Sequence, residues 1–132
     1  MLLNSEEISN DLGTLALRVT AGGTLLMQHG LPKLMAFGNL SGTFSDPLGV
    51  GHFISLILIL VAEVVCGTLV TLGLWTRIST IPPIIAMAVA TFMQHGDEPF
   101  KNQELGFLYM MAFLAVFLLG SGRFSLDRLN FR

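Results

Sequence analysis

Residues 50–74 read VGHFISLILILVAEVVCGTLVTLGL, and this stretch decides the fold class of the chain. Apart from a histidine near its start, its only ionisable side chains are those of Glu63 and Cys66. A helix needs about 20 predominantly apolar residues to cross the hydrocarbon core of a bilayer. The stretch is long and apolar enough, so we expect it to form a membrane-spanning helix.

The composition of the whole chain has the same character. Apolar residues make up 52% of the 132 residues and charged residues 12%, and the mean hydropathy is +0.70. Soluble domains carry roughly 25% charged residues. The net charge of −2 and the lack of a basic cluster also argue against nucleic acid as a partner. We therefore expect one integral membrane domain, residues 1–132.

Three further apolar segments reach the length of a membrane span, two of them narrowly. Together with residues 50–74 they predict an all-α, four-helix membrane bundle, whose spans are residues 12–31, 50–74, 78–95 and 103–119. The first helix is expected to have Asn10 or Asp11 as its N-cap. It is expected to stop at Gly30, shortly before a proline.

The arginines indicate how the bundle is oriented. An even number of spans places both termini on one side of the membrane. Most of the cations fall on that side, namely Arg77, Arg123, Arg128 and Arg132, whereas the other side carries Lys33 and Lys101. Because loops rich in Lys and Arg face the cytoplasm, we expect the N and C termini to be cytoplasmic.

The tetrapeptide Met-Gln-His-Gly occurs twice, at residues 27–30 and 93–96, each time at the end of an apolar run. A proline and a lysine follow each copy. The remaining two helices both end in glycine and then Arg-x-Ser, at Arg77 and Arg123. This pattern is compatible with an internal repeat of two helical hairpins in parallel topology. It is equally compatible with a working site shared by the two copies, or with two similar helix ends.

Glu63 occupies the most costly position in the sequence. A charged carboxylate at the bilayer centre costs about 2.5–3.5 kcal/mol. It must therefore face the bundle interior and be paired, hydrogen-bonded or protonated there. One interpretation is an ion pair with Arg18, which lies near the inner end of the first helix. The other is a proton-accepting carboxylate beside a redox cofactor or a transported ion.

His29 and His95 lie within the two tetrapeptide copies and have a simple structural interpretation. The helix dipole favours a histidine in the last turn, and Gly30 and Gly96 would follow as C′ residues. Two functional alternatives exist: both histidines could be axial ligands of a b-type haem, or an imidazole could hydrogen-bond a quinone carbonyl. Haem is the weaker alternative because two histidines at helix ends are a weak signal. No other metal site is expected.

Small residues in the first two helices are expected to mark close contacts between helices, because a missing side chain lets two backbones approach. The glycines concerned are Gly22, Gly23, Gly67 and Gly73.

Three segments carry a family resemblance: LRVTAGGTLLMQHGLPKLMAFG, AEVVCGTLVTLGLWTRIS and NQELGFLYMMAFLAVFLLGSGRFSLD. In this order they resemble the DoxX family of small membrane proteins. The resemblance implies a multi-pass, four-helix protein of the bacterial or archaeal cytoplasmic (inner) membrane. It also implies respiratory redox chemistry, because the family name comes from a small subunit of a thiosulfate:quinone oxidoreductase and other members are linked to oxidative-stress membrane complexes. The family's polar positions correspond here to Arg18, His29, Lys33, Glu63, Asn102 and Glu104; the family pattern does not place His95.

The function we expect is a membrane subunit associated with quinone-linked redox chemistry, with a partner subunit supplying the electrons. If it is an enzyme, it is the membrane part of a quinone-linked oxidoreductase. The catalytic candidates are Glu63, His29 and Lys33. The candidates for binding the cofactor, a quinone, are His29, Gln28, Arg18, His95, Asn102 and Glu104.

Two alternative functions stay open. One is a non-catalytic accessory subunit that packs against a larger membrane complex, and the other is a small proton- or solute-conducting bundle. Besides the lipid bilayer, the expected partners are other membrane or redox subunits, or further copies of the chain.

Overall fold

The computed structural model describes residues 2–130, and every regular element in that range is helical, which confirms the all-α class. In chain order the elements are α1 (Asn10–Thr24), the π-helical η1 (Leu25–Gly30), α2 (Leu31–Met35), α3 (Phe37–Leu40), α4 (His52–Leu60), the π-helical η2 (Val61–Val65), α5 (Cys66–Leu72), α6 (Thr76–Ala88), the π-helical η3 (Val89–Gln94), α7 (Phe100–Leu119) and α8 (Leu126–Asn130).

Three helices in the described part of the chain are long and apolar enough to cross a membrane: His52–Leu72, Thr76–Gln94 and Phe100–Leu119. They correspond to the second, third and fourth expected spans and identify a multi-pass membrane protein. The first helix runs without a break from α1 through η1 into α2. It does not belong to this apolar group, because Arg18, Gln28 and His29 make it more polar.

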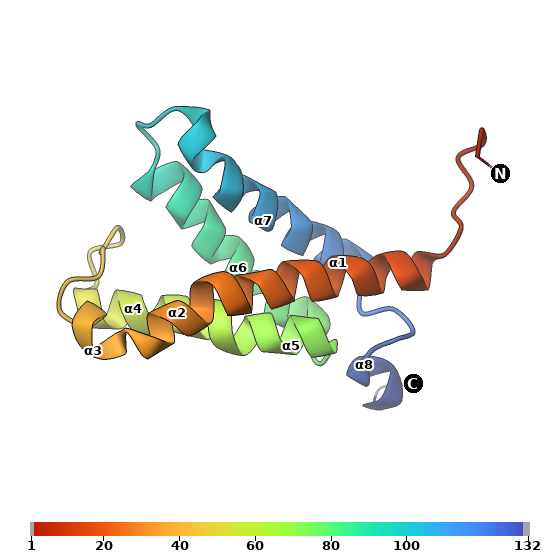
Figure 1. The fold of residues 1–132 in the computed structure, drawn as a ribbon, viewed down its shortest axis with the longest axis horizontal. Coiled ribbons are helices and arrows are strands. Elements are labelled where there is room, and N and C mark those ends of the chain that lie inside the picture. Colours follow the sequence, from red (N-terminus) through yellow and green to blue (C-terminus); the bar gives the residue numbers. More distant parts are fainter. Residues whose placement is uncertain (1, 131–132) are drawn as a thin grey trace.

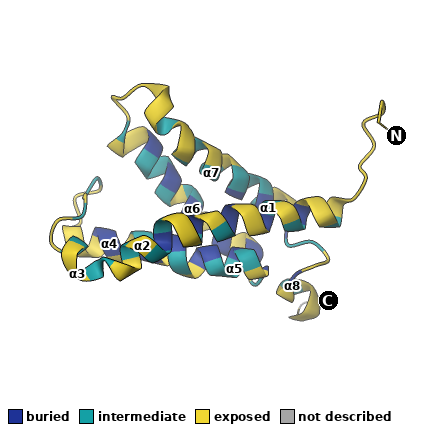
Figure 2. Ribbon diagram, in the orientation of Figure 1, coloured by how far each residue is buried: buried dark blue, intermediate teal, exposed yellow. Residues whose placement is uncertain are grey.

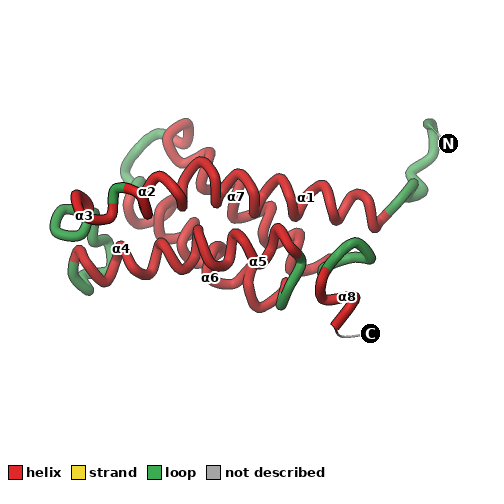
Figure 3. Tube along the Cα trace, turned by 60° about the horizontal axis from the view of Figure 1, so that its bottom comes forward, coloured by secondary structure: helices red, strands yellow, loops and turns green. Residues whose placement is uncertain are grey.

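The helices form two pairs (Figures 1 and 3). In Figure 1, α1 crosses the molecule with α4 and α5 beneath it, and α6 and α7 form a hairpin that rises away toward one side. Both termini lie at one end of the bundle, which we call the terminal end. At the other, distal end lie α3 and the turn between η3 and α7.

The core lies where the two pairs meet (Figure 2). Its buried apolar residues come from α1, η1, α5, α6 and α7: Ala21, Leu25, Val70, Met87, Phe113 and Val116. The outward faces of α4 and α7 carry exposed apolar side chains, among them Ile54, Leu58 and Leu108. Because such faces are unfavourable in water, they are suited to contact with the lipid bilayer.

The ends of the first helix differ from expectation. Its N-cap is Ser9, whose hydroxyl accepts a hydrogen bond from the amide of Leu12 at 3.2 Å, rather than Asn10 or Asp11. Gly30 does not stop the helix, because its backbone is helical and the chain continues through Pro32 to Met35. Gly30 is buried against η2: a Cβ there would lie 3.1 Å from the backbone carbon of Glu63. It therefore serves close packing, whereas Gly96 in the second copy does occupy C′ after the C-cap His95.

Close packing of the first two helices depends on Gly22 and Gly67. A Cβ on Gly22 would lie 2.7 Å from the carbonyl oxygen of Gly67, and one on Gly67 would lie 3.2 Å from the carbonyl oxygen of Gly22. The expectation for Gly23 was wrong, because nothing lies within 4 Å of its Cβ position. Gly73 has φ +74° and ends α5 beside the guanidinium of Arg18.

Arg18 does not pair with Glu63. Its side chain is fully buried and turns toward the terminal end, where Nη1 donates to the carbonyls of Val70 (3.4 Å) and Thr71 (3.2 Å). Nη2 donates to the carbonyl of Phe124. Glu63 lies seven residues before Val70, roughly 10 Å away along a helix. Arg18 thus fastens the end of α5 and the C-terminal segment to α1, and the predicted staple is wrong.

Candidate functional site

Three π-helical segments lie on the helices that surround one pocket. η1 carries His29, η2 carries Glu63 and η3 carries Thr91. A π-helical turn widens a helix by one residue and re-aims its side chains, and such turns occur frequently at functional sites. Three of the helices around the pocket thus depart from regular α-helical geometry where they line it.

The pocket has a volume of about 290 Å³ and lies toward the distal end. Its apolar wall includes Leu25, Ile59 and Met87. Its polar and aromatic lining consists of His29, Lys33, Phe44, Ser45, Glu63, Thr91, Gln94, His95, Asn102, Gln103 and Tyr109. Small-molecule pockets are typically mostly apolar with a few convergent polar groups and start near roughly 300 Å³. The lining and the volume of this pocket therefore suit a ligand whose headgroup is a single aromatic ring.

Glu63 and Lys33 form an ion pair at the centre of the lining. Lys33 Nζ lies 2.7 Å from Glu63 Oε1, and it also donates to the carbonyl of His29 at 3.4 Å. The side chain of Glu63 is 2% exposed and that of Lys33 25%. Glu63 therefore faces the bundle interior and is paired, as its cost requires, but the partner is Lys33. Because α2 continues the first helix past Gly30, the lysine stem can reach back along the helix to the carboxylate.

His29 and Tyr109 meet beside this pair. Their ring centroids are 5.5 Å apart and the rings are nearly perpendicular, at 87°. This edge-to-face geometry is favourable for aromatic pairs. The contact orients the imidazole between Lys33 on its own helix and the phenol on α7. An imidazole and a phenol are thus in contact in the lining of the pocket that also contains the Lys33–Glu63 pair.

Thr91 was not predicted as a site residue. Its side chain is 1% exposed, and its hydroxyl has no hydrogen-bond partner among the described residues. The hydroxyl packs on Gly106, where a Cβ would lie only 2.5 Å away. Buried polar groups are nearly always satisfied. Thr91 thus lies in the pocket wall with its hydroxyl turned onto α7 at Gly106 and without a partner among the described residues.

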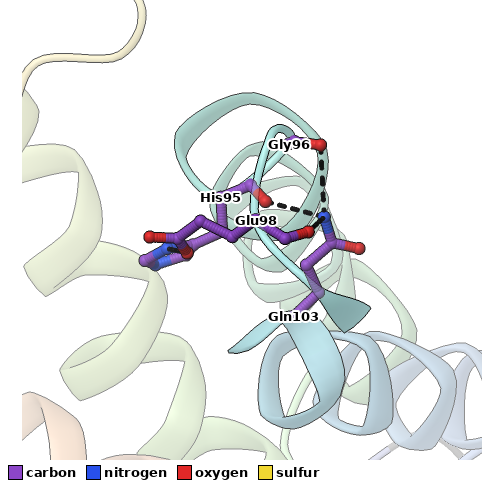
Figure 4. Close-up of polar contacts among 4 residues, drawn as sticks. All are labelled: His95, Gly96, Glu98 and Gln103. Atoms are coloured by element: carbon purple, nitrogen blue, oxygen red, sulfur yellow. Dashed lines mark hydrogen bonds and ion pairs between the residues drawn. The ribbon is translucent and has the colours of Figure 1, made fainter. Parts of the chain in front are cut away.

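The distal rim of the pocket is braced by Gln103, as Figure 4 shows. Its Nε2 donates to the carbonyls of His95 (2.6 Å), Glu98 (3.3 Å) and Gly96 (3.4 Å). Nδ1 of His95 interacts with Oε2 of Glu98 at 2.5 Å, and both side chains are partly exposed. His95 is thus held at the distal rim, and both it and His29 are partly buried in the pocket lining.

The structure brings together five of the predicted site residues: His29, Lys33, Glu63, His95 and Asn102 all line the pocket. Three others lie elsewhere. Arg18 is buried toward the terminal end, and both Gln28 and Glu104 are exposed and outside the pocket lining. Tyr109 was also missed, although it is the one tyrosine of the chain. In the described range, no three His, Cys, Asp or Glu side chains are grouped so that they could hold a metal ion.

A loop anchored by Asp46 closes part of the pocket, because Phe44 and Ser45 belong to the lining. The carboxylate of Asp46 accepts hydrogen bonds from the amides of Val50 (2.9 Å) and Gly51 (2.8 Å) and from the hydroxyl of Ser55 (2.8 Å). The hydrogen bond from Ser55, followed by that from Gly51, lowers the pKa of Asp46 below its usual value. The carboxylate thus ties the loop to the start of α4.

We expect Asp46→Asn to loosen this loop at neutral pH, seen as faster amide hydrogen exchange at residues 44–51. Since the pKa of Asp46 is lower in the folded state, its stabilising effect is present above the unfolded-state pKa and is lost as the pH falls through the folded value. The difference between variant and wild type should therefore disappear in acid. Asp97→Asn, in the other distal loop, is the matched control; an equal effect there would contradict the anchoring role.

Comparison with protein families gives one match: the DoxX family model matches residues 13–96. The matched region runs from α1 to just past η3 and contains His29, Lys33, Glu63 and Thr91. No curated protein and no solved structure matches the chain.

Proposed function

Because the chain belongs to the DoxX family and buries a Lys33–Glu63 pair in the wall of a small pocket, we propose that it is a quinone-binding membrane subunit of a respiratory redox system. The observation that carries the proposal is that ion pair. A buried pair is a costly way to stabilise a bundle, whereas a carboxylate and an ammonium beside an imidazole can hold and pass protons.

The proposed arrangement in the membrane has four spans with both termini in the cytoplasm of a bacterium or archaeon. Both termini lie at one end of the bundle, as this requires (Figure 1). That end carries Arg77, Arg123 and Arg128, in keeping with the tendency of cationic loops to stay on the cytoplasmic side. The pocket then opens toward the outer leaflet.

The pocket residues fit a quinone headgroup. A quinone is flat and apolar, with two carbonyl acceptors, and it supplies two-electron redox chemistry when bound. Lys33 and Tyr109 offer N–H and O–H donors, and Leu25 and Met87 offer apolar walls. Lys33 and Tyr109 would donate to the headgroup. Glu63 would hold the proton exchanged through Lys33, with His29 as the next group on the way to the rim.

Electrons would come from a partner subunit. The sequence carries no flavin, nucleotide or iron–sulfur motif, so the chain needs an external electron donor. Such a partner would contact the chain through α7, since only 11% of its membrane-spanning window is buried within the chain and the rest is open to lipid or protein. A second candidate function is a non-catalytic accessory subunit docked through the same helix on a larger membrane complex.

The proposal is tested on the full chain purified in detergent, by extracting bound lipids and quantifying quinone by mass spectrometry. We expect close to one quinone per chain in wild type, and a loss of at least tenfold in Glu63→Gln and in His29→Ala. Glu104→Gln is the matched control, because Glu104 is an exposed carboxylate outside the pocket lining. It should retain quinone like wild type.

Two outcomes would count against quinone binding. Wild-type protein that carries no quinone but co-purifies with a large complex would favour the accessory function. An absorption spectrum of the same sample with a Soret band would instead indicate haem bound by His29 and His95.

A further inference from the structure

A second, larger cavity lies at the terminal end of the bundle, away from the pocket described above. Its volume is about 870 Å³, and three arginines line it: Arg77, Arg123 and Arg128. The proposed quinone chemistry does not use it. All three arginine side chains are exposed, so their charges are accessible to a ligand.

The two acidic residues of this cavity are already engaged by the backbone. Asp11 Oδ1 accepts a hydrogen bond from the amide of Arg123 at 3.0 Å. The carboxylate of Asp127 accepts from the amides of Trp75 (2.6 Å) and Thr76 (2.9 Å) and from the Thr76 hydroxyl (2.7 Å). Within residues 2–130, neither acid forms a salt bridge with the three arginines. With three arginines and two carboxylates, the lining has a formal charge of +1, and the carboxylates face backbone donors rather than the guanidinium groups.

Arg77 is held in place by its own helix pair. Its Nε donates to the carbonyl of Phe117 at 3.0 Å. Its Nη2 lies across Gly120, where a Cβ would be 3.1 Å away and where φ is +84°. A side chain at position 120 would displace the guanidinium. With Nε occupied, the two Nη groups remain as donors, and a guanidinium binds phosphate oxygens through such a pair.

The cavity also has an apolar wall, and this distinguishes the kind of ligand. Ile78 is 70% exposed and Leu119 is 49% exposed, and both line it. Trp75, at 57% exposed, completes the wall. These residues mark the ends of two membrane-spanning helices, the level at which tryptophan is enriched in membrane proteins. A ligand here would have its anionic group on the arginines and its apolar part along the helix ends.

We propose that this cavity binds the headgroup of an anionic phospholipid. The phosphate would lie on Arg77, Arg123 and Arg128, and the first carbons of the acyl chains would lie on Ile78 and Leu119. A soluble phosphate would leave the apolar wall uncovered, so the observations favour the lipid. Juxtamembrane cations attract anionic lipids by an amount equivalent to about fivefold in affinity for each Lys or Arg.

The test is lipid retention by the full chain, reconstituted in nanodiscs of phosphatidylcholine with about 20% phosphatidylglycerol, which gives a negative surface potential, and then extracted into detergent for native mass spectrometry. We expect phosphatidylglycerol to be retained preferentially. Arg123→Gln with Arg128→Gln should lower that retention by about 25-fold. Neither side chain forms a hydrogen bond or salt bridge with another described residue. Arg123 lies 6.0 Å from the centre of the Phe124 ring, at the outer limit of a cation–π contact, so folding should be little affected.

Lys101→Gln is the control, because Lys101 is an exposed cation at the distal end. It should retain lipid like wild type. Equal retention of phosphatidylcholine and phosphatidylglycerol, or full retention in the double variant, would overturn the proposal. A separate arm adds inorganic phosphate at millimolar concentration: displacement of the lipid by phosphate would show a soluble-anion site and would also overturn it.

Discussion

Replacement of Lys33 by methionine is expected to destabilise the folded protein by about 3 kcal/mol, the lower end of the range for removing one partner of a buried ion pair. Methionine keeps the length and apolar character of the lysine stem but removes the ammonium group. Glu63, 2% exposed, is then left without the charge that lies 2.7 Å away in the wild type. It must bury an unpaired carboxylate or take up a proton, and both are costly.

Variants of Glu63, alone and combined with Lys33→Met, distinguish an effect on stability from an effect on quinone binding. Glu63→Gln alone should be milder, because it removes the buried charge and leaves the more exposed Lys33. Lys33→Met combined with Glu63→Gln should regain most of the stability lost in Lys33→Met, since no unpaired carboxylate remains. Quinone retention should stay low in the double variant if Lys33 donates to the headgroup. Unfolding is followed by titration with a denaturing detergent. Additive effects of the two substitutions would show that the pair contributes nothing to folding.

The sequence was sufficient to identify Glu63 but not its partner. The position of a carboxylate within a long apolar segment is costly in any fold, so its burial could be predicted from local sequence alone. Choosing between two long cations, Arg18 and Lys33, required knowing where the first helix ends. Glycine followed by proline normally stops a helix. Here Gly30 is held in helical geometry by its contact with η2, and the helix carries Lys33 on to the carboxylate.

The π-helical segments illustrate a second limit. Each one changes which side chains face the pocket, yet nothing in the local composition of residues 25–30, 61–65 or 89–94 distinguishes π from α geometry. A π-helical turn is less favourable than an α-helical one and persists only where tertiary packing stabilises it. For this reason Thr91, which lies on η3, could not be assigned to the site from helix periodicity. Tyr109 lies on the regular helix α7 and was missed because the sequence does not show which face of α7 meets His29. The second, third and fourth spans were predictable, because length and hydropathy depend on the bilayer rather than on packing.

A methyl group added at Gly22 is expected to destabilise the bundle by about 1–3 kcal/mol, the usual effect of overpacking a tight contact. In Gly22→Ala the Cβ would lie 2.6 Å from the hydroxyl oxygen of Thr71 and 2.7 Å from the carbonyl oxygen of Gly67. The hydroxyl itself donates to that carbonyl at 2.7 Å, so it cannot turn away without losing a hydrogen bond. The carbonyl belongs to the backbone of α5, so relief requires α1 and α5 to separate.

The adjacent glycine provides a matched control for this prediction. Gly23 lies in the same helix, and nothing surrounds its Cβ position within 4 Å. Gly23→Ala should therefore be neutral or stabilise the protein by up to about 1 kcal/mol, because alanine is the better helix former. The measurement is the midpoint of unfolding in detergent for both variants, with helix content checked by circular dichroism. If both substitutions shifted the midpoint equally, the contact of α1 with α5 would not depend on close approach at Gly22. If Gly22→Ala lowers it and Gly23→Ala does not, the loss comes from that contact, because both changes add the same methyl group to the same helix.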